Sequence, residues 1–139
     1  MIKELAIIAG LLSPVSPDMQ RSFDALVMDF ATCHAYYGYK EAYFSIGDAA
    51  ERIKALGAQA TAAYEGRRLE TLAGLPSGTF YQRQAAISQD MKKTLDSPGF
   101  SGLYSVYEGF CEDLRENTGK HYLRHLRKPI KPMKTSDSV

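Results

Sequence analysis

The stretch "FATCHAYYGYKEAYF", residues Phe30 to Phe44, decides the fold that the sequence predicts. It holds one cysteine, one histidine and four tyrosines in fifteen positions, which is typical either of a reactive or metal-binding centre or of the buried face of a helix. Apolar residues recur here at spacings of three and four, the period of one helical face: Phe23, Leu26, Val27, Phe30, Cys33 and Tyr37. The pattern favours a helix whose core-facing side carries the cysteine.

The chemical alternatives for this stretch are weak. Cys33 followed by His34 lacks the C-x-x-C-H pattern of haem attachment, and zinc would need further ligands that are not close in the sequence. Neighbours on a helix point about 100° apart, so the two side chains could not work as a catalytic pair. Tyrosine rings pack while their hydroxyls stay solvated or bonded, and tyrosine is enriched at interfaces. Tyr36, Tyr39 and Tyr43 are therefore expected to line a partner-binding surface.

Three more helices are predicted after this one. Asp48 with Glu51 indicates a capped start, and Gly74 indicates the end of the second helix. Its apolar stripe is narrow, mostly small and suited to close helix contact: Ala49, Ile53, Leu56, Ala60 and Ala63. Thr79 and Gln82 form a second capping pattern before a helix with Phe80, Ile87, Met91 and Leu95. A fourth helix follows the Ser97-Pro98-Gly99 turn, with an apolar face of Leu103, Val106, Tyr107, Phe110, Cys111 and Leu114.

The sequence thus predicts an all-α protein, an antiparallel bundle of about four helices. In such a bundle the first and last helices are neighbours, and Cys33 and Cys111 lie near the middle of each. Their heights match, as a disulfide requires, because it needs Cα atoms about 4.4–6.8 Å apart. We expect a Cys33–Cys111 disulfide; the alternative is two buried free thiols.

The N-terminal sequence "MIKELAIIAGLLSPVSP" bears on the cellular compartment. Its apolar run, Leu5 to Leu12, is long enough for a signal-peptide core and too short to span a bilayer, although no A-x-A cleavage pattern follows. Residues 1–17 are predicted to be a signal peptide or a short N-terminal helix. Residues 18–119 form the bundle domain, and residues 120–139 a basic, largely flexible tail.

The tail carries an uneven share of the charge. It holds six of the 17 basic residues, whereas residues 1–119 carry 11 basic and 15 acidic groups. Such a segment binds an acidic protein face, lipid headgroups or nucleic acid, or it is only a solubilising terminus. The expected partner-binding cations are Lys120, Arg124, Arg127, Lys128 and Lys131. His121 and His125 share a helical spacing of four, but the glutamate of H-E-x-x-H is missing, so no metal site is predicted.

The segments "CHAYYGY" and "YSVYEGFC" give the chain a resemblance to small, mostly uncharacterised exported helical proteins of proteobacteria. The resemblance covers about a quarter of the chain and brings no known activity with it. It implies export and a disulfide.

No phosphate-binding glycine loop, G-x-S-x-G motif or Glu-x-x-His motif occurs in the sequence. We therefore expect a non-catalytic protein without cofactor or metal, periplasmic or secreted, that acts through protein contacts as an accessory, inhibitory or assembly subunit. A membrane surface is a further partner for the basic tail. The alternative is a cytoplasmic nucleic-acid-binding or regulatory protein that uses the basic tail and keeps both cysteines reduced.

Overall fold

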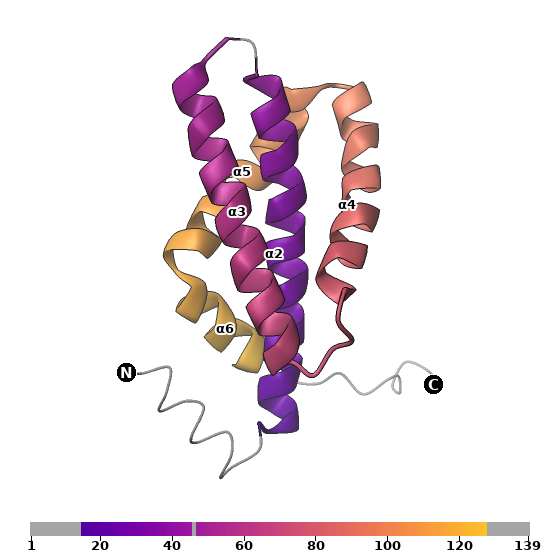
Figure 1. Ribbon diagram of the computed structural model, residues 1–139, viewed down its shortest axis with the longest axis vertical. Coiled ribbons are helices and arrows are strands. Elements are labelled where there is room, and N and C mark those ends of the chain that lie inside the picture. Colours follow the sequence, from indigo (N-terminus) through magenta and orange to yellow (C-terminus); the bar gives the residue numbers. More distant parts are fainter. Residues whose placement is uncertain (1–14, 46, 128–139) are drawn as a thin grey trace.

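The computed structural model describes residues 15–45 and 47–127, which form five α-helices (Figure 1). These are α2 (Pro17–Tyr43), α3 (Ala49–Leu72), α4 (Thr79–Asp96), α5 (Phe100–Glu116) and α6 (Thr118–Arg127). Since neither range contains a strand, the predicted all-α class is confirmed for them. None of the five helices is both long and apolar enough to cross a membrane. The predicted signal peptide lies outside the described residues, except for its last three positions.

α2 is the central helix and packs against each of the other four described helices, so the expected antiparallel bundle of about four helices is not confirmed (Figure 1). Its start agrees with the sequence, because the Ser16 hydroxyl accepts a hydrogen bond from the Met19 N–H at 3.1 Å and Pro17 occupies the first turn. α2 continues through Gly38 and ends at Tyr43. With neighbours on several sides, α2 buries more than one face.

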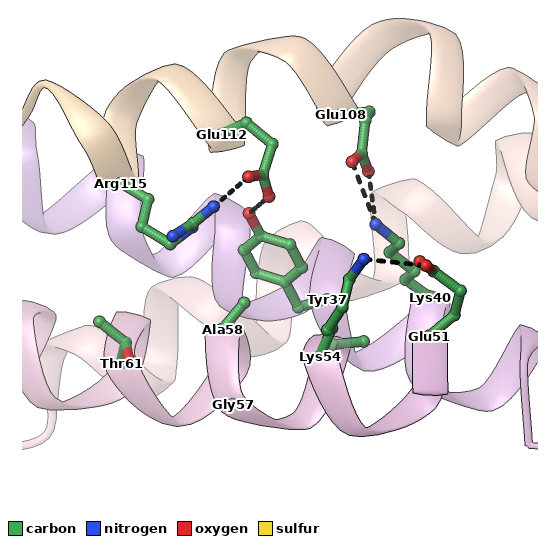
Figure 2. Close-up of a pocket in the computed structure, with 11 residues that line it drawn as sticks. Tyr37, Lys40, Glu51, Lys54, Gly57, Ala58, Thr61, Glu108, Glu112 and Arg115 are labelled. Atoms are coloured by element: carbon green, nitrogen blue, oxygen red, sulfur yellow. Dashed lines mark hydrogen bonds and ion pairs between the residues drawn. The ribbon is translucent and has the colours of Figure 1, made fainter. Parts of the chain in front are cut away.

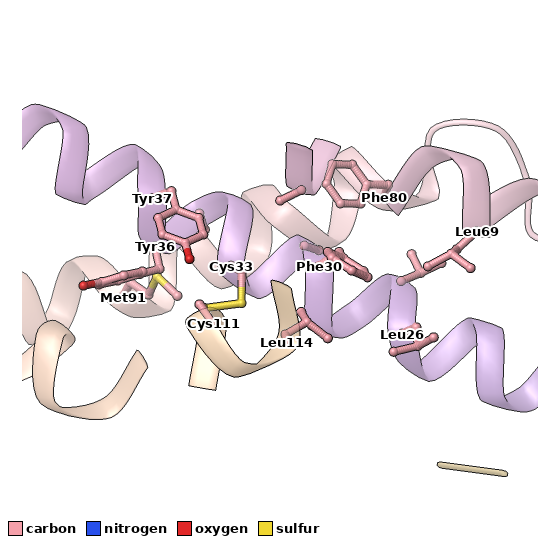
Figure 3. Packing of buried hydrophobic residues seen from close by; sticks show 14 of the residues in the cluster. Leu26, Phe30, Cys33, Tyr36, Tyr37, Leu69, Phe80, Met91, Cys111 and Leu114 are labelled. Carbon is pink, nitrogen blue, oxygen red and sulfur yellow. A yellow bond between two sulfur atoms is a disulfide. The ribbon is translucent and has the colours of Figure 1, made fainter. Parts of the chain in front are cut away.

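The predicted disulfide is confirmed. Cys33 of α2 is bonded to Cys111 of α5, with their Cα atoms 5.5 Å apart (Figure 3). The two cysteines are 2% and 1% exposed, and Phe30 and Leu114 lie beside them in the core. The bridge does not join the first and last helices, because α6 follows α5.

α3 turns a different face to the core from the predicted one. Its buried residues include Ala55, Ala62, Gly66 and Leu69, whose small members bring α3 close to its neighbours. Most of the predicted stripe faces outward: Ile53 is 65% exposed and Leu56 is 39% exposed, whereas Ala63 is partly buried and packs against the core. The prediction that this stripe packs inside the bundle is wrong for all its residues except Ala63, because α3 has two apolar faces and the one with the smaller residues meets the core.

α4 begins with a cap that the sequence pattern missed. The Thr79 hydroxyl donates to the Pro76 carbonyl at 2.6 Å and does not cap the helix. The N–H groups of Gly78 and Phe80 donate instead to the two carboxylate oxygens of Glu70, at 3.1 and 2.7 Å. Glu70 is only 7% exposed, and these two bonds offset the cost of burying its charge. The end of α3 is thereby fastened to the start of α4.

The expectation of a flexible tail from residue 120 is wrong for residues 120–127. These residues belong to α6, whose inner side packs on the body of the protein. His121 is 2% exposed, the Tyr122 ring lies 5.2 Å from the Phe23 ring between centroids, and the Ser22 hydroxyl donates to the Tyr122 carbonyl at 2.7 Å. The sequence pattern missed this packing because α6 is short and rich in cations. Residues 128–139 lie outside the described residues.

Candidate functional site

A hollow of about 530 Å³ opens between α3 and α5, with α2 as its floor (Figure 2). It exists because α3 and α5 scarcely touch each other and the α3 wall carries small residues. Charged and polar side chains from all three helices line it: Tyr37, Lys40, Glu51, Lys54, Thr61, Glu108, Glu112 and Arg115. These charged side chains make the hollow a candidate functional site.

Two sets of three polar side chains connect α2 to α5 at this hollow. In the first set, the Tyr36 hydroxyl donates to Glu108 Oε1 at 2.5 Å, and Lys40 Nζ donates to both carboxylate oxygens at 3.0 Å. Burial raises the pKa of Tyr36, and the hydrogen bond to the Glu108 carboxylate raises it further. The phenol therefore stays protonated and acts as a donor.

The second set repeats the first one turn along α5. The Tyr37 hydroxyl donates to Glu112 Oε2 at 2.7 Å, and Arg115 donates to the other oxygen (Figure 2). Burial and then the bond to Glu112 raise the pKa of Tyr37. Burial opposes ionisation of Glu112, but its hydrogen bonds from Tyr37 and Arg115 outweigh burial and lower its pKa. The carboxylate is thus charged while the phenol is neutral.

The polar contacts at this hollow hold helices together. A tyrosine with a raised pKa is a poor base and a poor nucleophile at neutral pH. Each carboxylate that lines the hollow already has partners, including Glu51, which pairs with Lys54 at 3.0 Å. Among residues 15–45 and 47–127, no group of three or more histidine, cysteine, aspartate or glutamate side chains could hold a metal ion. The two sets fix α5 on α2 beside the disulfide.

The sequence reasoning missed Glu108 and Glu112 as partners of the tyrosine pair. Their spacing of four on a helix that also carries Cys111 was the available clue, because it places both carboxylates on one side of α5. Only the pairing of α5 with α2 shows which side chains meet them.

The three tyrosines predicted to face a partner lie in different surroundings. Tyr36 is fully buried, so it does not contribute to a surface in this structure. The Tyr39 hydroxyl donates to the Ser88 carbonyl on α4 at 2.9 Å. Tyr43 is 61% exposed and stacks on Phe100 with ring centroids 4.4 Å apart. The position of α2 among the other helices explains the difference, since Tyr36 lies on a buried side of this helix and Tyr43 lies at its exposed C-terminal end.

The predicted cations of the C-terminal region lie on one side of α6. Lys120, Arg124 and Arg127 are exposed, with Leu123, 43% exposed, between them. Their spacing of three and four places them on a single helical face. Lys128 and Lys131 lie outside the described residues.

The two histidines of α6 lie on its inner side. Nε2 of His121 lies 2.7 Å from Asp113 Oδ2 of α5, and Nε2 of His125 lies 2.8 Å from Asp29 Oδ2 of α2. Each histidine thus pairs with a different carboxylate. They act as anchors for α6.

A comparison of the chain with protein-family models, with curated proteins and with solved structures finds no match in any of the three. The resemblance to exported proteins of proteobacteria therefore stays a hypothesis, and function has to be inferred from the surfaces themselves.

Proposed function

We propose that the protein is a non-catalytic, exported binding protein whose α6 contacts an acidic surface of another protein. The observation that carries this proposal is the division of α6 into two sides. Its inner side is fixed to the body by Tyr122 and by the two histidine–aspartate pairs. Its outer side presents Lys120, Arg124 and Arg127 to solvent.

The physical support is preorganisation. Cations on a docked helix have a fixed spacing, so less conformational entropy is lost on binding than for a flexible tail. Within the described residues Arg124 and Arg127 form no salt bridge, and Lys120 has only a 3.7 Å contact with Asp113. Exposed cations that lack a close acidic partner among the described residues, as Arg124 and Arg127 do, are suited to steering an acidic partner. The buried Cys33–Cys111 bridge supports the exported part of the proposal, since such bonds persist in oxidising compartments.

Affinity retention from the native host tests this function. The full-length protein and Arg124→Glu/Arg127→Glu are immobilised, with Lys92→Glu/Lys93→Glu on α4 as the control for total charge. We expect one or more proteins to be retained by the wild type and the control, released as salt rises, lost with the α6 variant and unaffected by nuclease. Retention that nuclease abolishes would instead support the nucleic-acid-binding alternative, and equal retention by all three forms would refute a role for α6.

A further inference from the structure

The outer side of α3 carries an apolar face that the fold does not use. Ile53 and Tyr64 are each 65% exposed and Leu56 is 39% exposed, and the exposed Ala49 and Ala60 continue the same stripe. These positions recur at three and four residues, the pattern of a helix contact. The core packs on the other face of α3, so within the described residues no helix covers this exposed face.

A hollow of about 460 Å³ continues this face at the end of α3. Tyr64 belongs to both the stripe and the hollow, and Tyr81 of α4 lines the opposite wall. The Arg67 guanidinium lies 5.9 Å from the Tyr81 ring centroid, and Arg68 lines the same hollow while one of its guanidinium nitrogens donates to Glu65 at 2.7 Å. Glu70 also lines the hollow, but its carboxylate is held by the backbone at the start of α4. Arg67 over a tyrosine ring, with the remaining N–H groups of Arg68 in the same hollow, is suited to a carboxylate ligand.

The exposed charges of α3 are predominantly basic. The side chains of its cations are 45% exposed for Arg52, 71% for Lys54 and 50% for Arg68. The acidic side chains that pair with the last two, Glu51 and Glu65, are only 31% and 27% exposed. Two copies of this face placed together would bring cations against cations, which is unfavourable. The charge favours an acidic occupant over a second copy of the chain.

We propose that the outer face of α3 and the hollow at its end bind an acidic amphipathic α-helix of a partner protein. Apolar side chains of the partner at helical spacing pack on Ile53, Leu56 and Ala60, and its carboxylates pair with Arg67 and Arg68. The face from Ile53 to Arg68 is about 22 Å long, which corresponds to about four turns of a partner helix. This inference concerns a different surface from α6 and stands without the proposed role of α6.

Site-specific photo-crosslinking of the full-length protein in its native host tests the proposal. The crosslinking residue replaces Leu56 or Tyr64, and replaces Val106 in the control, because Val106 is a 60% exposed apolar residue on α5. We expect adducts from Leu56 and Tyr64 but not from Val106, and mass spectrometry should place the crosslink in an acidic amphipathic segment. Arg67→Glu/Arg68→Glu should lower the adduct yield by roughly tenfold or more, whereas Lys92→Glu/Lys93→Glu should not.

Three results would overturn the proposal: no adduct above the Val106 control, an adduct with a second copy or with residues 1–14 of the same chain, or a yield that Arg67→Glu/Arg68→Glu leaves unchanged. An adduct with a segment that lacks acidic residues counts against it as well. The melting temperatures of the variants show whether a lower adduct yield is caused by unfolding. We expect them to stay close to the wild-type value because the replaced side chains are exposed. Lysine substitutions of the partner's carboxylates should restore binding to Arg67→Glu/Arg68→Glu.

Discussion

Two glycines of α3 should respond in opposite directions to the same substitution. Gly57 faces the open hollow between α3 and α5, and no atom lies within 4 Å of the place where a Cβ would stand. At Gly66 an added Cβ would lie 2.2, 2.3 and 3.1 Å from three atoms of the Phe80 ring. Phe80 is 0% exposed, so its ring has no free space to move into.

The magnitudes follow from two opposing effects. Alanine is favoured over glycine inside a helix by about 1 kcal/mol, and this gain is available in full at Gly57. Overpacking of a buried site costs about 1–3 kcal/mol, and two contacts far below 3.0 Å place Gly66 at the upper end of that range. We expect Gly57→Ala to stabilise the protein by about 1 kcal/mol and Gly66→Ala to destabilise it by about 2 kcal/mol.

Thermal unfolding followed by circular dichroism measures both effects. For a domain of this size about 1 kcal/mol moves the melting temperature by roughly 3–5 °C. Gly57→Ala should therefore melt a few degrees above the wild type, and Gly66→Ala roughly 6–10 °C below it. If Gly66→Ala melts at or above the wild-type temperature, α3 does not pack on Phe80 through Gly66, and the assignment of the α3 core face is refuted.

Cys33→Ser removes a bridge between residues 78 apart, and the loss of chain entropy that this bridge imposes on the unfolded state corresponds to about 4.5 kcal/mol of stability. The free energy of unfolding measured in urea should fall by about that amount, and a fall below about 1 kcal/mol would contradict the prediction. Glu70→Ala leaves two N–H groups at the start of α4 without their acceptor and should cost about 1–3 kcal/mol in the same assay, whereas Glu70→Gln, which keeps one acceptor oxygen, should cost less. Burial and the bond to Glu112 raise the pKa of Tyr37 above its ordinary 10.0. The protonated phenol therefore stabilises the folded protein fully below pH 10, and this stabilisation is lost as the pH rises beyond that value. The melting temperature should fall on that alkaline side, and less steeply in Tyr37→Phe. The pKa of Glu112 is lowered from 4.5, so the stabilisation by this carboxylate is present above pH 4.5 and is lost as the pH falls below it. This contribution to the acid-side fall in melting temperature should be absent in Glu112→Gln, as a series of melting curves at acid pH would show.

Local patterns were sufficient to predict the features that depend on one helix at a time. The period of three and four in Phe23 to Tyr37 predicted α2, and Ser16 is a residue type that commonly caps a helix start, as it does here. The disulfide followed because each cysteine lay near the middle of a correctly predicted helix. The helix and its cap are properties of short segments, which the sequence states directly, whereas the disulfide also required the prediction that the two helices are neighbours.

Features that depend on a neighbour in space were not predictable in the same way. α3 has one apolar face with Ile53 and Leu56 and another with Ala55 and Gly66, and only the shape of the adjoining helices selects the second. The Glu70 cap joins residues eight and ten positions apart across a turn, so no local capping pattern contains it. The docking of α6 and the burial of Tyr36 likewise depend on how many helices surround α2.

The disulfide also divides the protein into a covalent ring and two branches. The ring runs from Cys33 to Cys111 and contains the whole of α3 and α4, whereas the first half of α2 and the whole of α6 lie outside it. A single protease cut in the turn between α3 and α4 would leave both pieces attached through the two sulfur atoms, and the outer face of α3 would remain on the protein. A single cut between α5 and α6 would leave α6 held only by noncovalent contacts. Exposure to proteases would therefore remove the basic face of α6 before it removed the apolar face of α3.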